Sequence, residues 1–529
     1  MNLIHDPWIP ISRFDSSKER IAPWQLLENH ESNPIYGLNY PRPDFNGAIT
    51  QFLIGLLQTC CKVDQEKWEE WLFSPPRANE LQKKFEQVAD AFNLSGDGPR
   101  FMQDFDTKLD GKLCEVEALL IDTPGEKTIQ NNSDHFVKKS SGGPMCEPCI
   151  AASLFTLQTN APSGGAGHRT SLRGGGPLTT LLQIQRDSPK FSPRGPTLFE
   201  QLWVNVLDNI SFGSNFQSNL ESGKQFPWMG PTRTSGEKEI ITPTNTNPIT
   251  VFWGMPRRIR LDFNNLQQGS CSVCGETTQK LVQNYLTKNY GENYEAWMHP
   301  LSPYYQNNEQ AWLPLHPQPG GIGYRQWLDL TNEQDGRKQA NVISGFYRST
   351  RLARKIGPVS LWAFGYDMDN MKARGWHESR MPVFLMSDSA KQTLLAESAG
   401  TLISAAKEVL KTLIQQIKKA WFPPNHKVRG KTSFIDIAFW SSTEMLFFQQ
   451  VDQFQKGIEN DEDLSTVNFE VMTQWHKEMV KSAVEIFDKW TESGNVEFSN
   501  FRRLAIARSD MQKIFYGPNL RRILGLPGP

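Results

Sequence analysis

The chain has 529 residues, 38% of them hydrophobic and 11% aromatic, and a formal net charge of −1. This composition excludes a disordered chain and a polycation that coats nucleic acid, and it leaves room for about two to four domains. An odd number of cysteines, no secretory signal and no apolar run as long as a membrane span favour a cytoplasmic protein.

The first part of the chain predicts a short strand followed by helices. Residues 1–11 predict the strand and an extended segment bounded by prolines. Apolar residues at helical spacing predict a buried helix at about 45–61, and two more helical pieces over about 68–92. The polar stretch 125–143 predicts a long loop, and such loops are either functional or disordered.

The middle of the chain, from 178 to 385, predicts an irregular α+β region. Short strand-like runs, among them 249–253 and 259–261, alternate with connections rich in proline, glycine and asparagine. This order does not fit a repeated βαβ unit.

Beyond about residue 386 the pattern becomes helical. Apolar residues recur at helical spacing in four stretches, at about 389–420, 433–454, 467–493 and 498–515. Long helices with short connections predict a four-helix bundle. The predicted fold class is therefore α+β, with a large irregular mixed domain over 1–385 and a C-terminal four-helix bundle over 386–529.

Two cysteine pairs with the same spacing give the clearest chemical signal: Cys146-Glu-Pro-Cys149 and Cys271-Ser-Val-Cys274. Two such knuckles supply the four sulfurs of a tetrahedral structural Zn²⁺ site, although buried or redox-active cysteines remain an alternative. A catalytic zinc is disfavoured because four cysteines leave no open position for water. We expect the metal to anchor the glycine-rich segment that follows the first pair.

That segment contains a run almost without side chains, from Ser163 to Gly167. A ligand can approach its backbone closely, and its N–H groups can donate to phosphate oxygens or base edges. His168, Arg169 and Arg173 follow and are placed to neutralise phosphates. A flexible connection is the alternative interpretation.

Motifs of common enzymes are missing from the sequence. It has no zinc-protease histidine pair, no nucleophile elbow and no phosphate loop with its lysine. Nothing in the sequence requires an enzyme, but a zinc-containing nucleic-acid enzyme and a nucleotide-binding module stay open as alternatives. Basic clusters, such as Arg257-Arg258, permit a nucleic-acid groove without proving one.

Several short motifs occur in a distinctive order and spacing. They are Asn2-Leu-Ile with Asp6 and Trp8-Ile-Pro10, Phe101-Met-Gln103, Ala151 to Pro162, Ser171-Leu-Arg-Gly-Gly175, Phe252-Trp253, Cys271 to Gly275, and Gly365-Tyr366. Together they resemble the CasA family, the large subunit of the type I-E CRISPR surveillance complex Cascade. The resemblance covers nearly the whole chain.

The resemblance implies a non-catalytic role in antiviral defence. Such a subunit assembles with the other Cascade subunits and the 5′ end of the CRISPR guide RNA. It recognises a short flanking motif (the PAM) in double-stranded target DNA from the minor groove, promotes strand separation and R-loop formation, and recruits a helicase-nuclease. The protein reads the short motif, whereas guide pairing reads the target sequence.

The resemblance also assigns residues to three DNA-reading elements. The glycine loop corresponds to Ser163, Gly164, Gly165, Ala166 and Gly167, with Ala166 where the family has glycine, and Arg169 lies beside it. The lysine finger corresponds to Lys288 or Asn289, of which the long cationic Lys288 suits a groove of negative potential better. The wedge corresponds to Asp369 and Asn370, with Asn370 and Met371 as better tips because aspartate is unfavourable near phosphates.

A fourth element is the loop at about 124–145. Its Phe136, Val137 and Lys138 resemble the family's docking contact for the guide RNA and a neighbouring subunit. An exposed Phe-Val in a polar loop fits anchoring on a partner, and disorder in the isolated chain is compatible with it. The C-terminal helices would contact the displaced strand and the small subunits.

Overall fold

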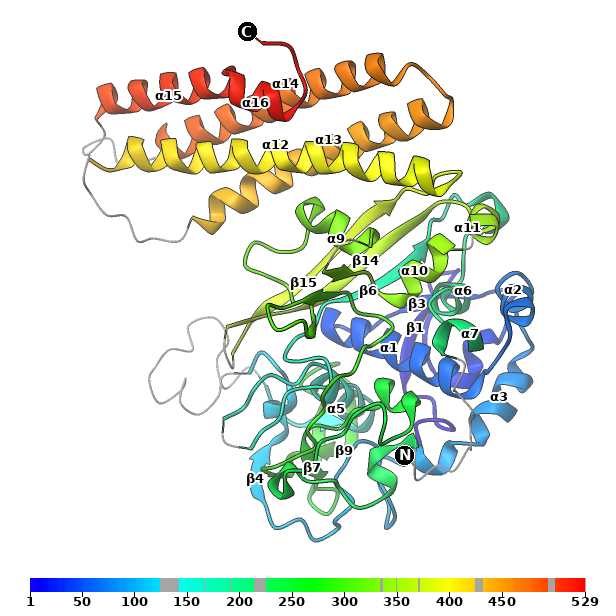
Figure 1. Ribbon diagram of the computed structural model, residues 1–529. Helices are drawn as coiled ribbons and strands as arrows, with labels where there is room; N and C mark the ends of the chain where they lie inside the picture. Colours follow the sequence, from blue (N-terminus) through cyan, green and yellow to red (C-terminus); the bar gives the residue numbers. More distant parts are fainter. Residues whose placement is uncertain are drawn as a thin grey trace. The chain divides into compact units, whose positions relative to one another are not determined.

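The computed structural model describes residues 1–528 except 124–141, 166, 192, 214–224, 334–335, 349, 370–371, 424–431 and 493–499 (Figure 1). The chain divides into two compact units: Met1–Pro317 with Gln334–Glu378, and Gln318–Glu333 with Ser379–Pro529. The sequence predicted a single domain boundary at residue 385, whereas in the structure the segment 318–333 from the middle of the chain belongs to the second unit.

Two buried helices form the centre of the first unit, α1 (Pro43–Cys60) and α5 (Glu147–Asn160), and they pack against each other. Phe52 of α1 makes edge-to-face contacts with five rings, those of Trp8, Phe92, Phe101, Phe155 and Trp253. Such aromatic pairs stabilise a core beyond the area that they bury. The helix predicted at 45–61 is confirmed.

Shorter helices surround this centre. Two of them are the helical pieces predicted over about 68–92, and they are separated because Ser74 ends the first helix and prolines follow it. The helices are α2 (Gln65–Phe73), α3 (Ala78–Glu86), α6 (Leu198–Trp203), α7 (Asn209–Phe212), α10 (Asn341–Arg348) and α11 (Thr350–Ile356).

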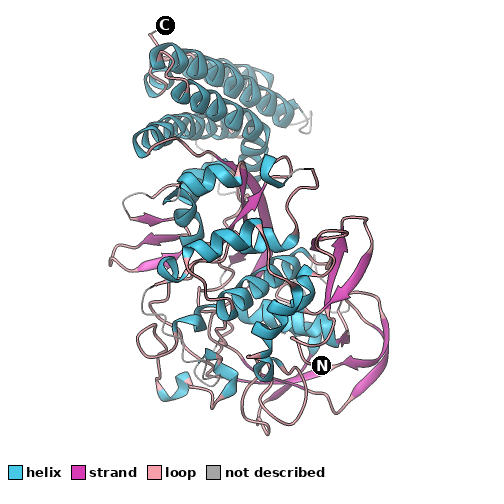
Figure 2. Cartoon of the chain, turned by 90° about the vertical axis from the view of Figure 1, so that its right-hand side faces the viewer, coloured by secondary structure: helices cyan, strands magenta, loops and turns pink. Residues whose placement is uncertain are grey.

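The described strands form small sheets of three strands each, scattered among helices and long loops (Figure 2). Two sheets lie in the amino-terminal region and beside the cysteine pairs: β2 (Lys18–Ile21), β1 (Ile9–Arg13) and β3 (Ile35–Leu38); β5 (Met145–Cys146), β9 (Thr277–Val282) and β8 (Leu266–Ser270). Three others are β4 (Lys112–Glu115), β10 (Asn284–Lys288) and β7 (Arg258–Leu261); β15 (Lys372–Val383), β14 (Val359–Asp369) and β6 (Thr179–Ile184); β12 (Trp312–Pro314), β11 (Tyr304–Gln306) and β13 (Arg337–Lys338). The predicted irregular α+β character is confirmed.

One predicted strand is wrong. Residues 249–253 were expected to be extended, but Pro248–Phe252 form a 3₁₀-helix. The Asn247 side chain accepts a hydrogen bond from the Ile249 N–H at 3.0 Å, and Pro248 occupies the first turn, where its missing N–H does no harm. The strand expected at 259–261 is present as β7.

The second unit is helical, as predicted. Asp388 begins its first long helix by accepting a hydrogen bond from the Lys391 N–H at 2.9 Å. The helices are α9 (Trp327–Thr331), α12 (Ser389–Trp421), α13 (Ser433–Glu459), α14 (Leu464–Glu492), α15 (Phe501–Phe515) and α16 (Pro518–Ile523). No described helix combines the length and apolar character that a membrane span requires.

Tyr324 explains why the segment 318–333 belongs to the helical unit. Its ring stacks on Phe447 of α13, with the ring centroids 4.4 Å apart. Its hydroxyl lies 2.8 Å from the Thr443 hydroxyl, so the polar end of this buried side chain has a partner. The aromatic ring therefore ties a segment from the middle of the chain into the helical core.

Candidate nucleic-acid interface and metal centre

The two cysteine pairs come together as predicted. Cys146 ends β5 and caps α5, and Cys149 lies in the first turn of that helix. Cys271 and Cys274 lie on the turn between β8 and β9, and β9 pairs with β5. The four sulfur atoms all lie within 4.8 Å of one another, so the four cysteines could hold a metal ion.

Hydrogen bonds surround the sulfur cluster. The Cys146 N–H donates to the Cys271 sulfur at 3.4 Å, and the Arg20 guanidinium donates to the Cys274 sulfur at 3.8 Å. Hydrogen bonds from Cys146 and Cys149 lower the pKa of Cys274 to about 6, whereas the neighbouring sulfurs raise the pKa of Cys149. Four crowded thiols thus favour partial ionisation, the state from which a bound cation displaces the remaining protons.

A metal ion held by the four cysteines would not touch the glycine loop, so any anchoring of the loop is indirect. The 14 residues of α5 lie between Cys146 and the loop. At 1.5 Å per residue this helix is about 21 Å long.

The glycine loop is an exposed turn. The Gly164 N–H donates to the His168 carbonyl at 3.4 Å, and the His168 N–H donates to the Gly165 carbonyl at 3.3 Å. Gly165 and Gly167 have φ angles of +84° and +79°, a conformation that favours glycine. Ser163, Gly164 and Gly165 are exposed, so the loop offers backbone to the solvent.

The segment predicted as the finger packs against this loop. The Tyr290 N–H donates to the Gly167 carbonyl at 2.7 Å, and a Cβ at Gly167 would lie only 2.9 Å from the Asn289 Cβ. A Cβ at Gly291 would overlap the Pro256 carbonyl oxygen, so only glycine allows this close approach. The structure therefore brings the glycine loop and the finger segment together.

The two finger candidates differ in their surroundings. Lys288 is the last residue of β10, is half-buried, and lies opposite Arg258 of β7. Asn289 is exposed and contacts the glycine loop. Lys288 and Asn289 therefore both lie at the contact between the glycine loop and the finger segment, which we call the joint. Lys288 is on the side of β10, and Asn289 is on the side of the loop.

The wedge segment lies between two hydrogen-bonded strands, β14 and β15. Asp369 ends β14 and forms an ion pair with Arg374 at 3.2 Å. The second glycine cluster packs on this hairpin, because a Cβ at Gly176 would lie 2.7 Å from the Tyr366 carbonyl oxygen. The chain that leaves the glycine loop thus contacts β14.

Arg173 was expected to neutralise phosphates, and this expectation is wrong. Its side chain is 2% exposed. It donates to Gln51 at 2.6 Å and to Thr179 and Ser302 at 3.0 Å each. Burial lowers the pKa of Arg173 to about 10. The guanidinium is a polar connection inside the core and cannot reach DNA.

The two residues that follow the loop, His168 and Arg169, are half-buried. Arg169 donates to the Ser235 hydroxyl at 2.9 Å. Burial and the nearby Arg257 lower the pKa of His168, so this imidazole is neutral at pH 7. Sequence reasoning missed Arg257, which lies under the loop. The only sequence signal for Arg257 was the basic pair Arg257-Arg258, and such a pair cannot be distinguished by sequence from solvated surface charge.

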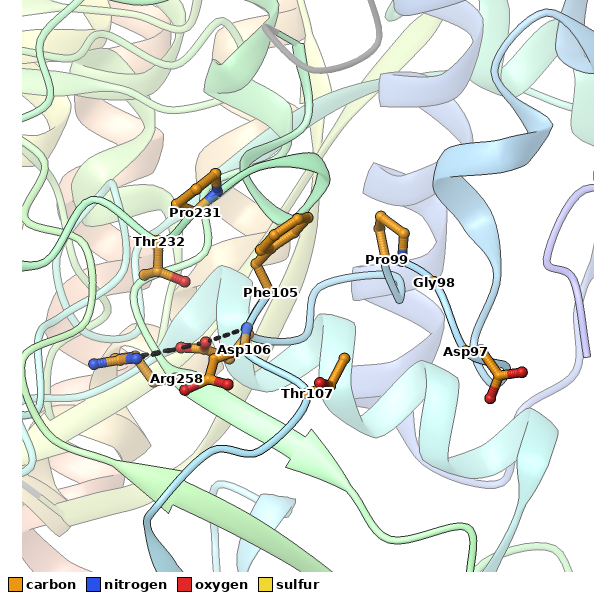
Figure 3. A pocket seen from close by; sticks show the side chains of 10 residues that line it. Asp97, Gly98, Pro99, Phe105, Asp106, Thr107, Pro231, Thr232 and Arg258 are labelled. Atoms are coloured by element: carbon orange, nitrogen blue, oxygen red, sulfur yellow. Dashed lines mark hydrogen bonds and ion pairs between the residues drawn. The ribbon is translucent and has the colours of Figure 1, made fainter.

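A pocket of about 530 Å³ adjoins the strand that pairs with the finger strand (Figure 3). Arg258 and Thr232 line one side of it, and Asp97 lies on the other (Figure 3). The guanidinium of Arg258 is paired with the buried Asp104 at 2.5 Å. The charge of Arg258 is therefore compensated within the protein.

Some predicted residues lie outside the described part of the chain: Ala166, Asn370, Met371, Phe136, Val137 and Lys138. Their assignments stay predictions.

Comparisons with known proteins cover almost the whole chain. The family described as CRISPR-associated protein Cse1 matches residues 2–486. CasA from Thermus thermophilus is 16% identical, with a TM-score of 0.66 over 99% of each chain. Cse1 from Thermobifida fusca is 14% identical, with a TM-score of 0.67 over 99% of this chain and 98% of that chain. A chain of a CRISPR RNA-guided surveillance complex is 15% identical, with a TM-score of 0.66 over 98% of this chain and 99% of that chain. These likenesses show a shared fold.

Proposed function

The chain belongs to the CRISPR-associated Cse1 (CasA) family, and on that premise we propose that it is the non-catalytic large subunit of an RNA-guided DNA surveillance complex, Cascade. In this role it binds the other Cascade subunits and the 5′ end of the guide RNA. It recognises the flanking motif of double-stranded DNA from the minor groove, promotes strand separation and R-loop formation, and recruits the helicase-nuclease.

The joint between the glycine loop and the finger segment is the observation that carries this proposal. Residues 163–167 and 288–291 are separated by more than a hundred positions in sequence, yet the Tyr290 N–H and the Gly167 carbonyl are 2.7 Å apart. An exposed backbone loop, the exposed Asn289 and the half-buried Lys288 thereby lie together in one part of the fold. That combination suits a groove in which the base pattern is degenerate and phosphates flank both sides.

The hairpin of β14 and β15 is proposed as the wedge that separates the strands below the motif. Asp369 is less unfavourable there than its charge suggests, because Arg374 neutralises it at 3.2 Å. Asn370 and Met371 would then form the tip. Separating stacked bases costs a few kcal/mol per step, which the contacts of the loop and finger must offset.

The four cysteines are proposed to bind a structural Zn²⁺. A tetrahedral site with Zn–S bonds of about 2.3 Å has sulfur–sulfur separations of about 3.8 Å. The Cys146 and Cys274 sulfurs are 3.7 Å apart. A four-thiolate site leaves no position for a reactive water, which agrees with a structural ion in a non-catalytic subunit.

The proposed function can be tested by reconstitution with the other Cascade subunits and a guide, followed by binding to duplexes with every possible flanking motif. The wild-type complex should discriminate strongly among the motifs. Gly165→Ala should weaken this discrimination, because a methyl group then projects from the exposed loop. Gly525→Ala is the matched control, since Gly525 also has a positive φ, of +64°, and open space around it. A wild-type complex that binds all motifs equally would overturn the proposal.

The same assay separates the two finger candidates. Lys288→Ala should weaken binding to the preferred motif more than Asn289→Ala, because the ammonium group adds charge attraction to the groove. The reverse order would assign the finger to Asn289.

A further inference from the structure

Arg257 is a buried guanidinium directly beneath the glycine loop. Its side chain is 8% exposed. Its Nη2 donates to the Pro162 carbonyl, at the start of the loop. Its Nη1 lies against Gly164, where a Cβ would be only 2.5 Å away. Any side chain at position 164 would therefore displace the guanidinium, which gives this glycine a role beyond flexibility.

The charge of Arg257 is not compensated within the described residues. No ion pair to it is present among them, and its Nε is buried without a hydrogen-bond partner. The two ionisable groups with which its charge interacts, Tyr285 and His168, are neutral at pH 7, because burial raises the pKa of Tyr285 and lowers that of His168. Burial lowers the pKa of Arg257 itself to about 10, so the guanidinium remains charged. A buried charge without a counter-charge is unfavourable.

Burial alone does not set Arg257 apart, because Arg173 is buried as well. It too lacks a carboxylate partner among the described residues, but Gln51, Thr179 and Ser302 accept its hydrogen bonds, and no nitrogen of it is buried without a partner. The Arg257 guanidinium donates to a single described acceptor, the Pro162 carbonyl, and lies under exposed backbone. The two buried arginines therefore differ in their hydrogen bonding: Arg257 has a buried nitrogen without a described partner, and Arg173 has none.

We infer that Arg257 provides the positive charge for an anion that binds on the exposed face of the glycine loop, and that this anion is a backbone phosphate of the duplex beside the flanking motif. The N–H groups of Ser163 and Gly165, on either side of Gly164, donate to no described residue. Unpaired N–H groups over a buried positive charge form an anion site. The inference rests on the proposed function, and it makes the loop a phosphate contact as well as a reader of bases.

The test combines Arg257 variants with duplexes that carry one uncharged methylphosphonate at each backbone position around the motif. In the reconstituted wild-type complex, one position should weaken binding about tenfold or more, as expected for a charge-assisted hydrogen bond. Arg257→Met should weaken binding to the normal duplex similarly and lose no further affinity at that position. Arg257→Lys, which keeps the charge, should retain part of the sensitivity.

Arg173→Met is the matched control for loss of a buried arginine. It should lower stability while leaving the sensitivity to every methylphosphonate unchanged. Independent effects of Arg257→Met and the methylphosphonate at all positions would overturn the inference while leaving motif recognition standing. The same holds if Arg257→Met alters the motif preference alone, because the loop would then contact bases only. A wild-type complex without motif-dependent binding would instead refute the proposed function.

Discussion

Replacing Gly167 with alanine should open the joint between the glycine loop and the finger segment. Two costs can be separated. The φ of +79° is unfavourable for alanine by about 1 to 2 kcal/mol. The new methyl would also lie 2.9 Å from the Asn289 Cβ and 3.0 Å from the Tyr290 nitrogen, whereas ordinary contact begins at 3.4 Å. Relieving this overlap weakens the Tyr290–Gly167 hydrogen bond, which contributes about 1 kcal/mol. The total is about 2 to 3 kcal/mol.

Amide hydrogen exchange at Tyr290 in the full-length protein measures this effect. Gly167→Ala should speed the exchange about 30- to 150-fold, the factor that corresponds to about 2 to 3 kcal/mol. Gly165→Ala is the matched comparison, because its φ of +84° brings the same strain but a Cβ there meets no atom within 4 Å. Its effect should be smaller by the cost of the contact. Equal acceleration in the two variants would refute the reasoning that the finger packs on the loop.

Two further predictions concern the metal and a buried carboxyl group. Cys146→Ser and Cys271→Ser should each lower the zinc content measured by mass spectrometry below one ion per chain, whereas Cys60→Ser, outside the cluster, should not; full occupancy in either cluster variant would contradict the four-sulfur site. Burial raises the pKa of Glu292 from 4.5 to about 7, so the folded state binds this proton more tightly than the unfolded state. Its contribution to stability is therefore complete below about pH 4.5 and is lost as the pH rises through about 7. Glu292→Gln should reduce the pH dependence of the free energy of unfolding, measured by denaturant unfolding at a series of pH values across that range.

The sequence predicted those features that depend on local spacing. Cysteine pairs two residues apart indicated a knuckle, and helical periodicity located the long helices, because both patterns are complete within one segment. The helix at Pro248–Phe252 was missed because a proline and an asparagine cap outweighed a β-branched, aromatic run.

The burial and hydrogen bonding of Arg173 and Arg257 depend on contacts between distant parts of the chain, so they could not be predicted from the sequence. Arg173 is buried because Gln51 and Ser302 accept its hydrogen bonds from more than 120 residues away. Arg257 lies under the glycine loop because its backbone N–H and carbonyl are hydrogen-bonded to Gln158, near the end of α5. Neighbouring basic residues in a sequence therefore do not show which guanidinium is in an ion pair, which is hydrogen-bonded to neutral groups, and which keeps a buried nitrogen without a described partner.

The metal site and the glycine loop are connected through the secondary structure that leads from each cysteine pair. The first pair begins α5, and the loop follows the end of that helix. The second pair is followed by β9 and β10, and the finger segment begins where β10 ends. A metal ion shared by the two pairs would therefore fix the start of α5 and of β9, while the hydrogen bond from the Tyr290 N–H to the Gly167 carbonyl joins the segments that follow them. Loss of the metal should consequently disturb the loop by altering how α5 and the strands are placed. Amide exchange at Tyr290 should therefore accelerate in Cys271→Ser, although the 14 residues of α5 separate Cys146 from the loop.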